Sequence, residues 1–332
     1  MKQAANVMPT SAPPAVEDPL IVVCTLLSRA DNTPVSERSA APGRGYDDVD
    51  VSERGPTDQK PSSALEANPN LNFEHWGEYW RKVHAVRFTH SDEPDDDSLS
   101  RLMRYEQLHR FAPGPTSTDA PPYRPPLDGH GKLWPTILGH VEPYRRPRWD
   151  GVAYLTFRSL DDVPAVLNTE RIRSKIIPED REIFCELAPI LARQFIVVPS
   201  QTGVEPVTFV QTVKRNPDLT RQEFHHWWLN SHGNYLAKAA VPSIRRYAQL
   251  HNIGSAERGQ PFSHDEIRDI DGVSLTSFGS LNDLEEYLST DTYRAIANHE
   301  STQTVASETR GWTAVGMVIV NTPGAERRTR NA

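Results

Sequence analysis

The sequence predicts an α+β protein that contains two copies of one βαββαβ unit. The main observation is a repeated motif of aromatic, histidine and amide residues. It runs Trp80-x-x-x-His84 then Arg104-Tyr105-x-Gln107-Leu108-His109, and returns as Trp228-x-x-x-His232 then Arg246-Tyr247-x-Gln249-Leu250-His251. Strand and helix patterns follow in the same order around each copy. A motif that returns with its surroundings indicates a duplicated structural module.

The second copy, residues 201–322, is compact. Thr220-Arg221-Gln222-Glu223 is a capping box, which begins a helix that continues to about Ala240. Asp271-Gly272 predicts a turn before a strand. The other predicted elements are strands at 206–212, 244–251, 273–278 and 314–320, and a helix capped by Ser280.

The first copy, residues 18–200, follows the same order with long insertions. Nineteen of the 28 prolines lie in residues 1–150. The regions of about 29–70 and 111–149 show no period of 2 or 3.6, so we expect loops or disordered insertions there. Residues 1–17 are expected to be disordered and 323–332 to be a flexible tail. The predicted elements are strands at 20–27, 102–109, 152–157 and 194–198, and helical segments at 73–88 and 160–191.

A four-stranded sheet with both helices on one face leaves its other face bare, and that apolar face must be covered. The sheet of the second copy can cover it. We therefore expect two ferredoxin-like units packed sheet to sheet as an intrachain dimeric α/β barrel. Such a chain is complete as a monomeric pseudo-dimer, and association into a homodimer stays open.

Composition and charge exclude several functional classes. The formal net charge is −8 and the mean hydropathy is −0.58, so no basic face for nucleic acid is expected. No apolar stretch approaches the ~20 residues that a membrane span needs, and no secretory signal is evident. The only two cysteines, Cys24 and Cys185, suit a reduced cytoplasmic interior. Standard zinc, nucleotide and serine hydrolase motifs do not occur.

Three motifs of the second copy together resemble the signature of EthD-domain proteins. They are Phe224-x-x-x-Trp228-x-x-x-His232, Arg246-Tyr247-x-Gln249-x-His251 and Asp271-Gly272-Val273. The first copy is similar, with Trp76 in place of Phe224, so the chain resembles a tandem EthD-domain protein. The resemblance implies the dimeric α/β-barrel superfamily, which includes cofactor-free monooxygenases, lactone isomerases, polyketide cyclases, fungal decarboxylases and haem enzymes. It therefore indicates the fold better than the reaction.

The two helical histidines are the candidate catalytic residues. A histidine with a pKa near ~6.5 moves protons at neutral pH, which suits His84 and His232 as general acids or bases. Strand alternation places the Tyr, Gln and His of each repeated motif on one face. A tyrosine hydroxyl and a glutamine amide there could hold a developing oxyanion, and a tryptophan could stack on an aromatic substrate. The candidate substrate-binding residues are Trp80, Tyr105, Gln107, His109, Trp228, Tyr247, Gln249 and His251.

Packing is the plainer interpretation of the same residues. Tryptophan and histidine can fill the layer between helix and sheet, and duplication copies a packing requirement as faithfully as a site. Three polar side chains on one strand face are costly to bury without partners, so they indicate a wet cavity or a hydrogen-bonded network. The sequence leaves open whether this face meets the helix or the seam of the barrel.

No organic cofactor and no metal site are predicted. His225 and His226 are adjacent, but no carboxylate or cysteine stands at ligand spacing, and we expect both near solvent or the helix edge. A haem bound by a single helical histidine is the alternative that the resemblance leaves open.

The sequence favours an enzyme that uses histidine acid/base chemistry on a small apolar or aromatic carbonyl or phenolic substrate, polyketide-like in character. Decarboxylation, dehydration, cyclisation and isomerisation are the expected reactions, of lyase or isomerase type. One alternative is an EthD-type oxidoreductase, either cofactor-free or haem-dependent. Another is an accessory protein that binds a ligand without catalysis. Because insertions crowd only the first copy, we expect the two sites to differ.

Overall fold

The computed structural model of the chain describes residues 19–29, 73–91, 96–110, 149–178, 180, 184–200, 203, 205–240, 244–255, 257, 259, 261–263 and 265–325. The expected disordered segment 1–17, nearly all of both expected insertions, and residues 326–332 of the expected tail lie outside this described part.

The first half of the chain forms one βαββαβ unit. Strand β1 (Ile21–Arg29) is followed by helix α1 (Phe73–Tyr79), which continues through a π-helical turn (Trp80–His84) and a 3₁₀ turn (Ala85–Phe88). A 3₁₀ turn (Ser98–Arg101) precedes strands β2 (Leu102–Arg110) and β3 (Gly151–Phe157). The unit ends with helix α2 (Asp162–Leu167), a π-helical turn (Ile172–Ile176) and strand β4 (Phe184–Val198).

The second half repeats this order. Its first elements are strand β5 (Val207–Val213), helix α4 (Arg221–Trp227), a π-helical turn (Trp228–Gly233), helix α5 (Asn234–Ala239) and strand β6 (Arg246–Asn252). Helix α6 (Asp265–Arg268), strand β7 (Gly272–Phe278) and helices α7 (Leu281–Ser289) and α8 (Asp291–Ser301) follow. A 3₁₀ turn (Ala306–Glu308) leads into strand β8 (Arg310–Asn321). The predicted capping box at Thr220 and Glu223 and the cap at Ser280 are both present.

The eight strands form one closed antiparallel barrel, in the order β1-β3-β2-β8-β5-β7-β6-β4. Each half contributes four adjacent strands, and the halves meet where β2 pairs with β8 and β4 with β6. The predicted α+β fold with a barrel is therefore confirmed. The sheets do not only face each other, as the sequence suggested, but are also hydrogen-bonded along both edges.

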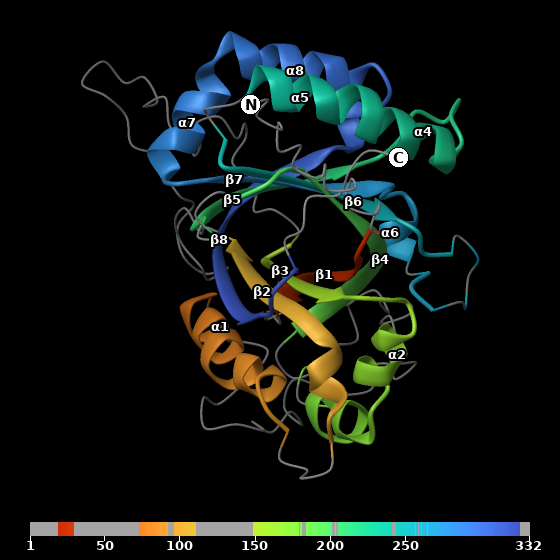
Figure 1. The fold of residues 1–332 in the computed structure, drawn as a ribbon, viewed down its shortest axis with the longest axis vertical. Helices are drawn as coiled ribbons and strands as arrows, with labels where there is room; N and C mark the ends of the chain where they lie inside the picture. Colours follow the sequence, from red (N-terminus) through yellow and green to blue (C-terminus); the bar gives the residue numbers. More distant parts are fainter. Residues whose placement is uncertain are drawn as a thin grey trace, which may run out of the picture.

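The barrel lies between two helical layers, with α1 and α2 on one side and α4, α5, α7 and α8 on the other (Figure 1). Its interior is an apolar core to which both halves contribute, including Leu26, Tyr154, Leu250 and Trp312. Separate apolar clusters fill the spaces between the barrel and each helical layer. In the part of the chain that the structure describes, no helix has both the length and the apolar character needed to cross a membrane.

Two segments differ from the sequence prediction. The helix expected over 160–191 ends early, because strand β4 begins at Phe184, and Cys185 lies in this strand rather than in a helix. Leu and Ala are strong helix formers, but tertiary packing overrides helix propensity, and here barrel closure prevails, with Ala188, Ile190 and Ala192 alternating into the interior. Helix α8 was not predicted at all.

Candidate functional site

The candidate histidines lie between helix and sheet in both halves. His84 ends one π-helical turn, and His232 lies near the end of the other. Both are buried. A π-helical turn shifts the side-chain phase of a helix and is often found at functional sites. In an ideal helix, Ser231 and Tyr235 would lie on the same side as the buried Trp228 and His232. Both are exposed here.

The polar face of strand β2 points toward the helix and not into the barrel. Gln107 donates from Nε2 to the carbonyl of Trp80 at 2.8 Å and to the Tyr105 hydroxyl at 2.8 Å. Nε2 of His109 lies 3.0 Å from Oε1 of Gln107. The sequence could not decide which way the face of Tyr105, Gln107 and His109 points, and the structure shows that it meets the helix.

This network fixes where the protons lie. The carbonyl of Trp80 can only accept, so Gln107 must turn its NH₂ group toward it and toward Tyr105, and its oxygen must accept from His109. The Tyr105 hydroxyl accepts from Gln107 and keeps its own proton, which it can donate to Nδ1 of His84, 3.2 Å away. Neutral His84 then carries its proton on Nε2.

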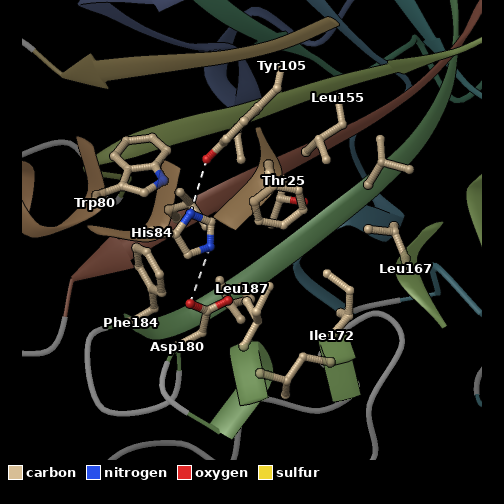
Figure 2. Close-up of a pocket in the computed structure, with 16 residues that line it drawn as sticks. Thr25, Trp80, His84, Tyr105, Leu155, Leu167, Ile172, Asp180, Phe184 and Leu187 are labelled. Atoms are coloured by element: carbon tan, nitrogen blue, oxygen red, sulfur yellow. Dashed lines mark hydrogen bonds and ion pairs between the residues drawn. The ribbon is translucent and has the colours of Figure 1, made fainter. Parts of the chain in front are cut away.

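Asp180 completes the first site. Its Oδ1 lies 3.3 Å from Nε2 of His84, at the ion-pair distance, and both side chains are 8% exposed. His84 therefore bridges a carboxylate and a tyrosine hydroxyl, as Figure 2 shows. Oδ1 of Asp180 makes no hydrogen bond within the described residues, so its contact with His84 is an ion pair. A histidine between a hydroxyl and a carboxylate has the order of residues of a general base with an acidic partner.

A cavity opens beside these three residues. It has about 520 Å³ of space free of atoms, its opening to solvent included. Aliphatic side chains from β1, β3, β4 and the segment around α2 form most of the wall, with Trp80, Phe88 and Phe184 as aromatic neighbours (Figure 2). A largely apolar cavity with a few convergent polar groups is the usual form of a small-molecule site.

The second half repeats the strand network. Gln249 donates from Nε2 to the carbonyl of Trp228 at 2.9 Å and to the Tyr247 hydroxyl at 3.2 Å. His251 places Nε2 3.0 Å from Oε1 of Gln249. The carbonyl of Trp228 can only accept, so Gln249 turns its NH₂ group toward it and toward Tyr247. The Tyr247 hydroxyl accepts from Gln249, and its own proton is available to another group.

The histidine of the second half has different partners. Nδ1 of His232 lies 3.2 Å from Nδ1 of His299, and its Nε2 lies 3.6 Å from Oε1 of Glu300. Within the described residues, His232 makes no hydrogen bond to Tyr247. Glu300 also accepts from Trp228 Nε1 at 3.2 Å and Gln211 Nε2 at 2.8 Å. The two sites therefore differ in the contacts of histidine and tyrosine.

A second cavity, of about 380 Å³ including its opening, lies at this site. Its wall is richer in polar groups than the first. Of the candidate residues, Trp80, His84 and Tyr105 line the first cavity, and His232 and Tyr247 line the second. The others stand behind them and position the tyrosines: Gln107, His109, Trp228, Gln249 and His251.

Burial shifts the titration of several of these groups. It lowers the pKa of His109 and of His232 to about 3, with smaller effects from Arg81 and His299 respectively. It also lowers the pKa of His251 and raises that of Tyr247. Burial raises the pKa of Glu300 to about 7, against the opposing hydrogen bonds of Trp228 and Gln211.

His225 is half-buried, where a position near solvent or the helix edge was expected. Its Nε2 is 2.7 Å from the carbonyl oxygen of Asp271, and its ring lies 4.5 Å from that of His251. Burial lowers its pKa to about 4. His226 is exposed, as the sequence predicted.

Three residues of these sites were not predicted from the sequence: Asp180, His299 and Glu300. Each carboxylate comes from the helical segment that precedes the last strand of its half, and each meets the histidine of the first helix. A signal for α8 was present in Thr290, whose side chain caps the helix at Tyr293 N. Glu300 is 68 residues from His232 in the sequence, and Asp180 is 96 residues from His84. No local pattern predicts a contact over such separations.

The residues of neither cavity fit a haem. Both ring nitrogens of His84 face protein partners, Tyr105 and Asp180, and both of His232 face His299 and Glu300. An axial ligand needs one imidazole nitrogen directed at the iron. In the described part of the chain, no group of three or more His, Cys, Asp or Glu side chains could hold a metal ion.

The closed antiparallel barrel carries the helix–strand motif in both of its halves. Residues 216–304 match the family model of the EthD domain, so this part of the chain is an EthD domain. This match confirms the resemblance inferred from the second copy of the motif. No curated protein matches the chain.

Solved structures similar to the chain are distant in sequence. An anthrone oxidase-like protein has 11% identity and a TM-score of 0.49, covering 95% of this chain and 98% of that one. A "putative monooxygenase" from Lactobacillus acidophilus NCFM has 10% identity and a TM-score of 0.43, covering 92% and 98%. A mutant chlorite dismutase from Candidatus Nitrospira defluvii has 12% identity and a TM-score of 0.36, covering 90% and 92%. These likenesses concern architecture alone.

Proposed function

We propose that the chain is a tandem EthD-type enzyme that carries out proton-transfer chemistry in the first cavity. The first half would be a diverged copy of the EthD domain in residues 216–304. Two parallel contacts support a duplication: Gln107 with the Trp80 carbonyl, and Gln249 with the Trp228 carbonyl. The bridge from Asp180 through His84 to Tyr105, at the wall of a largely apolar cavity, is the observation that carries the catalytic proposal.

The substrate class follows from the wall of this cavity. Aliphatic and aromatic side chains favour a small apolar or aromatic molecule, and in the described residues no lysine or arginine lines the cavity to bind an anionic group. Among the described residues that line the cavity, the polar side chains are those of Thr25, His84, Tyr105 and Asp180. A ligand with one carbonyl or phenolic oxygen directed at Tyr105 would satisfy these contacts, and polyketide-like compounds have this chemistry.

In the first step, the substrate oxygen replaces His84 as acceptor of the Tyr105 proton. Nδ1 of His84 is then free to accept a proton from the carbon next to the carbonyl, or from a phenol. The electron pair of the broken C–H or O–H bond moves to the substrate oxygen, and the Tyr105 hydroxyl stabilises the resulting charge. Asp180 stabilises the imidazolium through Nε2–H.

The second step returns the proton. Delivery to a different carbon gives isomerisation, and delivery to a leaving hydroxyl gives dehydration. Attack of the enolate carbon on a carbonyl of the same molecule, with protonation of the new alkoxide, gives cyclisation. A β-keto acid would instead give its carboxyl proton to Nδ1 of His84, lose CO₂ from the carboxylate, and then take that proton at carbon from the His84 imidazolium. Each of these reactions balances without an oxidant.

Hydrogen exchange in D₂O tests the first step before the natural substrate is known. Acetophenone and 2-cyclohexenone are suitable probes, with loss of the signals of hydrogens acidified by the carbonyl followed by ¹H NMR. His84→Ala should slow protein-dependent exchange by about 10²–10⁴-fold, and Tyr105→Phe by roughly 10²-fold. His226→Gln, at an exposed histidine of α4, is the matched control and should exchange at the wild-type rate. Exchange that does not depend on His84 would contradict the proposal.

An EthD-type oxidoreductase remains the alternative function. It shares the deprotonation step, because a phenolate or enolate is the form of such a substrate that reacts with oxygen, and the same apolar cavity would favour that reaction. Oxygen consumption that accompanies substrate loss, or a Soret band in the purified protein, would favour it. Binding of the probes without exchange or oxygen uptake would favour a non-catalytic binding protein.

A further inference from the structure

The second cavity contains a line of groups that connects its wall with the protein surface. His299 is half-buried, and Nδ1 of its ring lies 3.2 Å from Nδ1 of the buried His232. Nε2 of His232 lies 3.6 Å from Oε1 of Glu300, which lines the cavity. No part of the function proposed for the first cavity uses these three residues.

The contact between two Nδ1 atoms restricts the protons of both rings. One of the two must carry a proton on Nδ1 and the other must accept it. If His299 donates, neutral His232 carries its proton on Nε2 and faces an ionised Glu300. If His232 donates, its Nε2 is bare and faces a protonated Glu300. Both arrangements satisfy the 3.2 Å hydrogen bond between the rings, and both place one proton between His232 and Glu300, which face each other at the ion-pair distance of 3.6 Å.

The two arrangements are linked by the uptake of one proton. A proton that arrives at Nε2 of His299 allows the Nδ1 proton of that ring to pass to His232. His232 then releases its Nε2 proton to Glu300. The proton added at the half-buried ring thus emerges on a carboxylate in the cavity, and both histidines end neutral with their tautomers exchanged.

Aromatic stacking holds the outer ring in position for this transfer. The His299 ring stacks on Trp227, with centroids 5.3 Å apart and planes at 14°, and on Tyr235, at 4.8 Å and 24°. These contacts fix the direction of Nδ1 toward His232 without using a nitrogen of His299. A ring that served packing alone would not need to present Nδ1 to the neighbouring Nδ1.

The environment of Glu300 suits a group that gains and loses a proton near neutrality. In the described residues, no lysine or arginine lines the cavity. The side chains that donate hydrogen bonds to Glu300, Trp228 and Gln211, are neutral. Burial raises the pKa of Glu300 to about 7. The other titratable groups lining the cavity are His232 on the π-helical turn and the tyrosines of β6, α7 and α8: Tyr247, Tyr287 and Tyr293.

We propose that the second cavity is an acid–base site of its own, in which Glu300 exchanges a proton with a bound carbonyl or phenolic compound and is reprotonated from solvent through His299 and His232. Tyr247 would bind the ligand oxygen, because its hydroxyl accepts from Gln249 and keeps its own proton to donate. The relay first delivers a proton from solvent to Glu300, and Glu300 then transfers this proton to the ligand. His232 and His299 act through Glu300 and are positioning and relay residues.

Infrared spectroscopy tests the relay without a substrate. A protonated buried carboxyl gives a carbonyl band that disappears on ionisation, and Glu300→Gln identifies it. After a rapid drop in pH, the band should form roughly tenfold or more slowly in His299→Phe than in the wild type. Phenylalanine keeps the stack with Trp227 and Tyr235 but removes both nitrogens. His299→Gln is the second variant, for the case that His299→Phe does not fold, and it should slow the band in the same way.

His226→Gln, a change at an exposed histidine outside the relay, should leave the rate of band formation unchanged. A structural role of His299 would change stability but not this rate. A Glu300 band that forms equally fast in wild type and both His299 variants would overturn the relay. So would a spectrum with no band assignable to Glu300.

Phenol tests the ligand class in the same measurement. Bound phenol should shift the Glu300 band in the wild type and in His84→Ala, and Tyr247→Phe should abolish the shift. No shift up to the solubility limit of phenol would overturn the ligand assignment. Because the His84→Ala variant lacks the base proposed for the first cavity, the outcome is independent of the function proposed there.

Discussion

Gly151 lies against the indole ring of Trp80: an ideal Cβ on Gly151 would come within 2.5 Å of Cζ3 of that ring. Gly272 has the same relation to Trp228, at 2.4 Å. Neither glycine has a positive φ, so backbone freedom is not the reason for glycine here. The sequence suggested a turn at Asp271-Gly272, whereas the structure shows that Gly272 begins strand β7 and makes room for a tryptophan.

Gly151→Ala and Gly272→Ala should each lower the free energy of unfolding by about 1–3 kcal/mol, because the added methyl forces a buried indole to move. Urea denaturation measures the loss. Gly77→Ala is the matched control, since its Cβ would meet His109 only at 3.5 Å, an ordinary contact, and alanine favours a helix over glycine. A loss at Gly77 equal to that at Gly151 would show that the tryptophan contact is not the cause.

Local signals allowed much of the fold to be predicted. The helix that begins at Thr220 has a capping box, and alternation marks the strand that contains Tyr247. Pairing between the halves could not be predicted, because the edges of β2 and β4 bear no sign of their partners. The segment from Phe184 to Leu191 was assigned to a helix, although it belongs to strand β4. Ala188 and Ile190 are buried because the barrel closes around them, and this burial is not visible in the sequence.

The candidate site could be predicted only as far as one helix and one strand determine it. His84 and Tyr105 come from elements with clear patterns, and the structure brings them within 3.2 Å. Asp180 and Glu300 come from the helical segment before the last strand of each half. The sequence predicted one long helix around Asp180 and no helix at Glu300. Which histidine meets a tyrosine and which meets a second histidine depends on how those crossovers pack, and no spacing in the chain encodes this.

Asp271 is a fully buried carboxylate that joins three segments. Its Oδ1 accepts from Arg215 at 2.7 Å and from Arg221 at 3.0 Å, and its Oδ2 accepts from the backbone N–H of Arg215 at 2.9 Å. Asp271→Asn should lower the free energy of unfolding by about 3–5 kcal/mol, because it removes the charge of a fully buried carboxylate that two half-buried arginines bind. Asp269→Asn is the control, since Asp269 is 71% exposed and pairs with Lys214 at 3.5 Å.

The loss for Asp269→Asn should be about 0–1 kcal/mol, as for other exposed ion pairs. Denaturant unfolding of the two variants side by side measures the difference. Similar losses for Asp269→Asn and Asp271→Asn would mean that the arginines find other partners and that burial does not decide the cost.

Cys24 should be unreactive in the native protein. It is a free, buried cysteine in the barrel interior, and burial raises the pKa of its thiol to about 12. Since the thiolate is the reactive form, labelling requires the barrel to open. In a Cys185→Ser background, a thiol reagent at mildly alkaline pH should react only after urea unfolds the chain. Rapid labelling without urea would show that strand β1 opens locally.

Glu300 should make stability depend on pH in an unusual direction. Burial raises its pKa from 4.5 to about 7, so between these values the folded state holds a proton that the unfolded chain has released. Stability contributed by this proton is complete below pH 4.5 and is lost as the pH rises through 7. The full effect is about 3 kcal/mol, from the shift in pKa. His232 acts oppositely, since its lowered pKa, about 3, makes stability fall as the pH drops below 6.5.

Comparison with Glu300→Gln separates the two effects, because His232 is common to both proteins. The glutamine variant should gain up to about 3 kcal/mol relative to wild type as the pH rises from 5 to 8. Urea midpoints at several pH values measure the difference. Glu286→Gln, at an exposed residue of α7, is the control and should keep a constant difference from wild type across this range. A constant difference for Glu300→Gln as well would mean that Glu300 is ionised in the folded protein throughout, stabilised by a proton on His232.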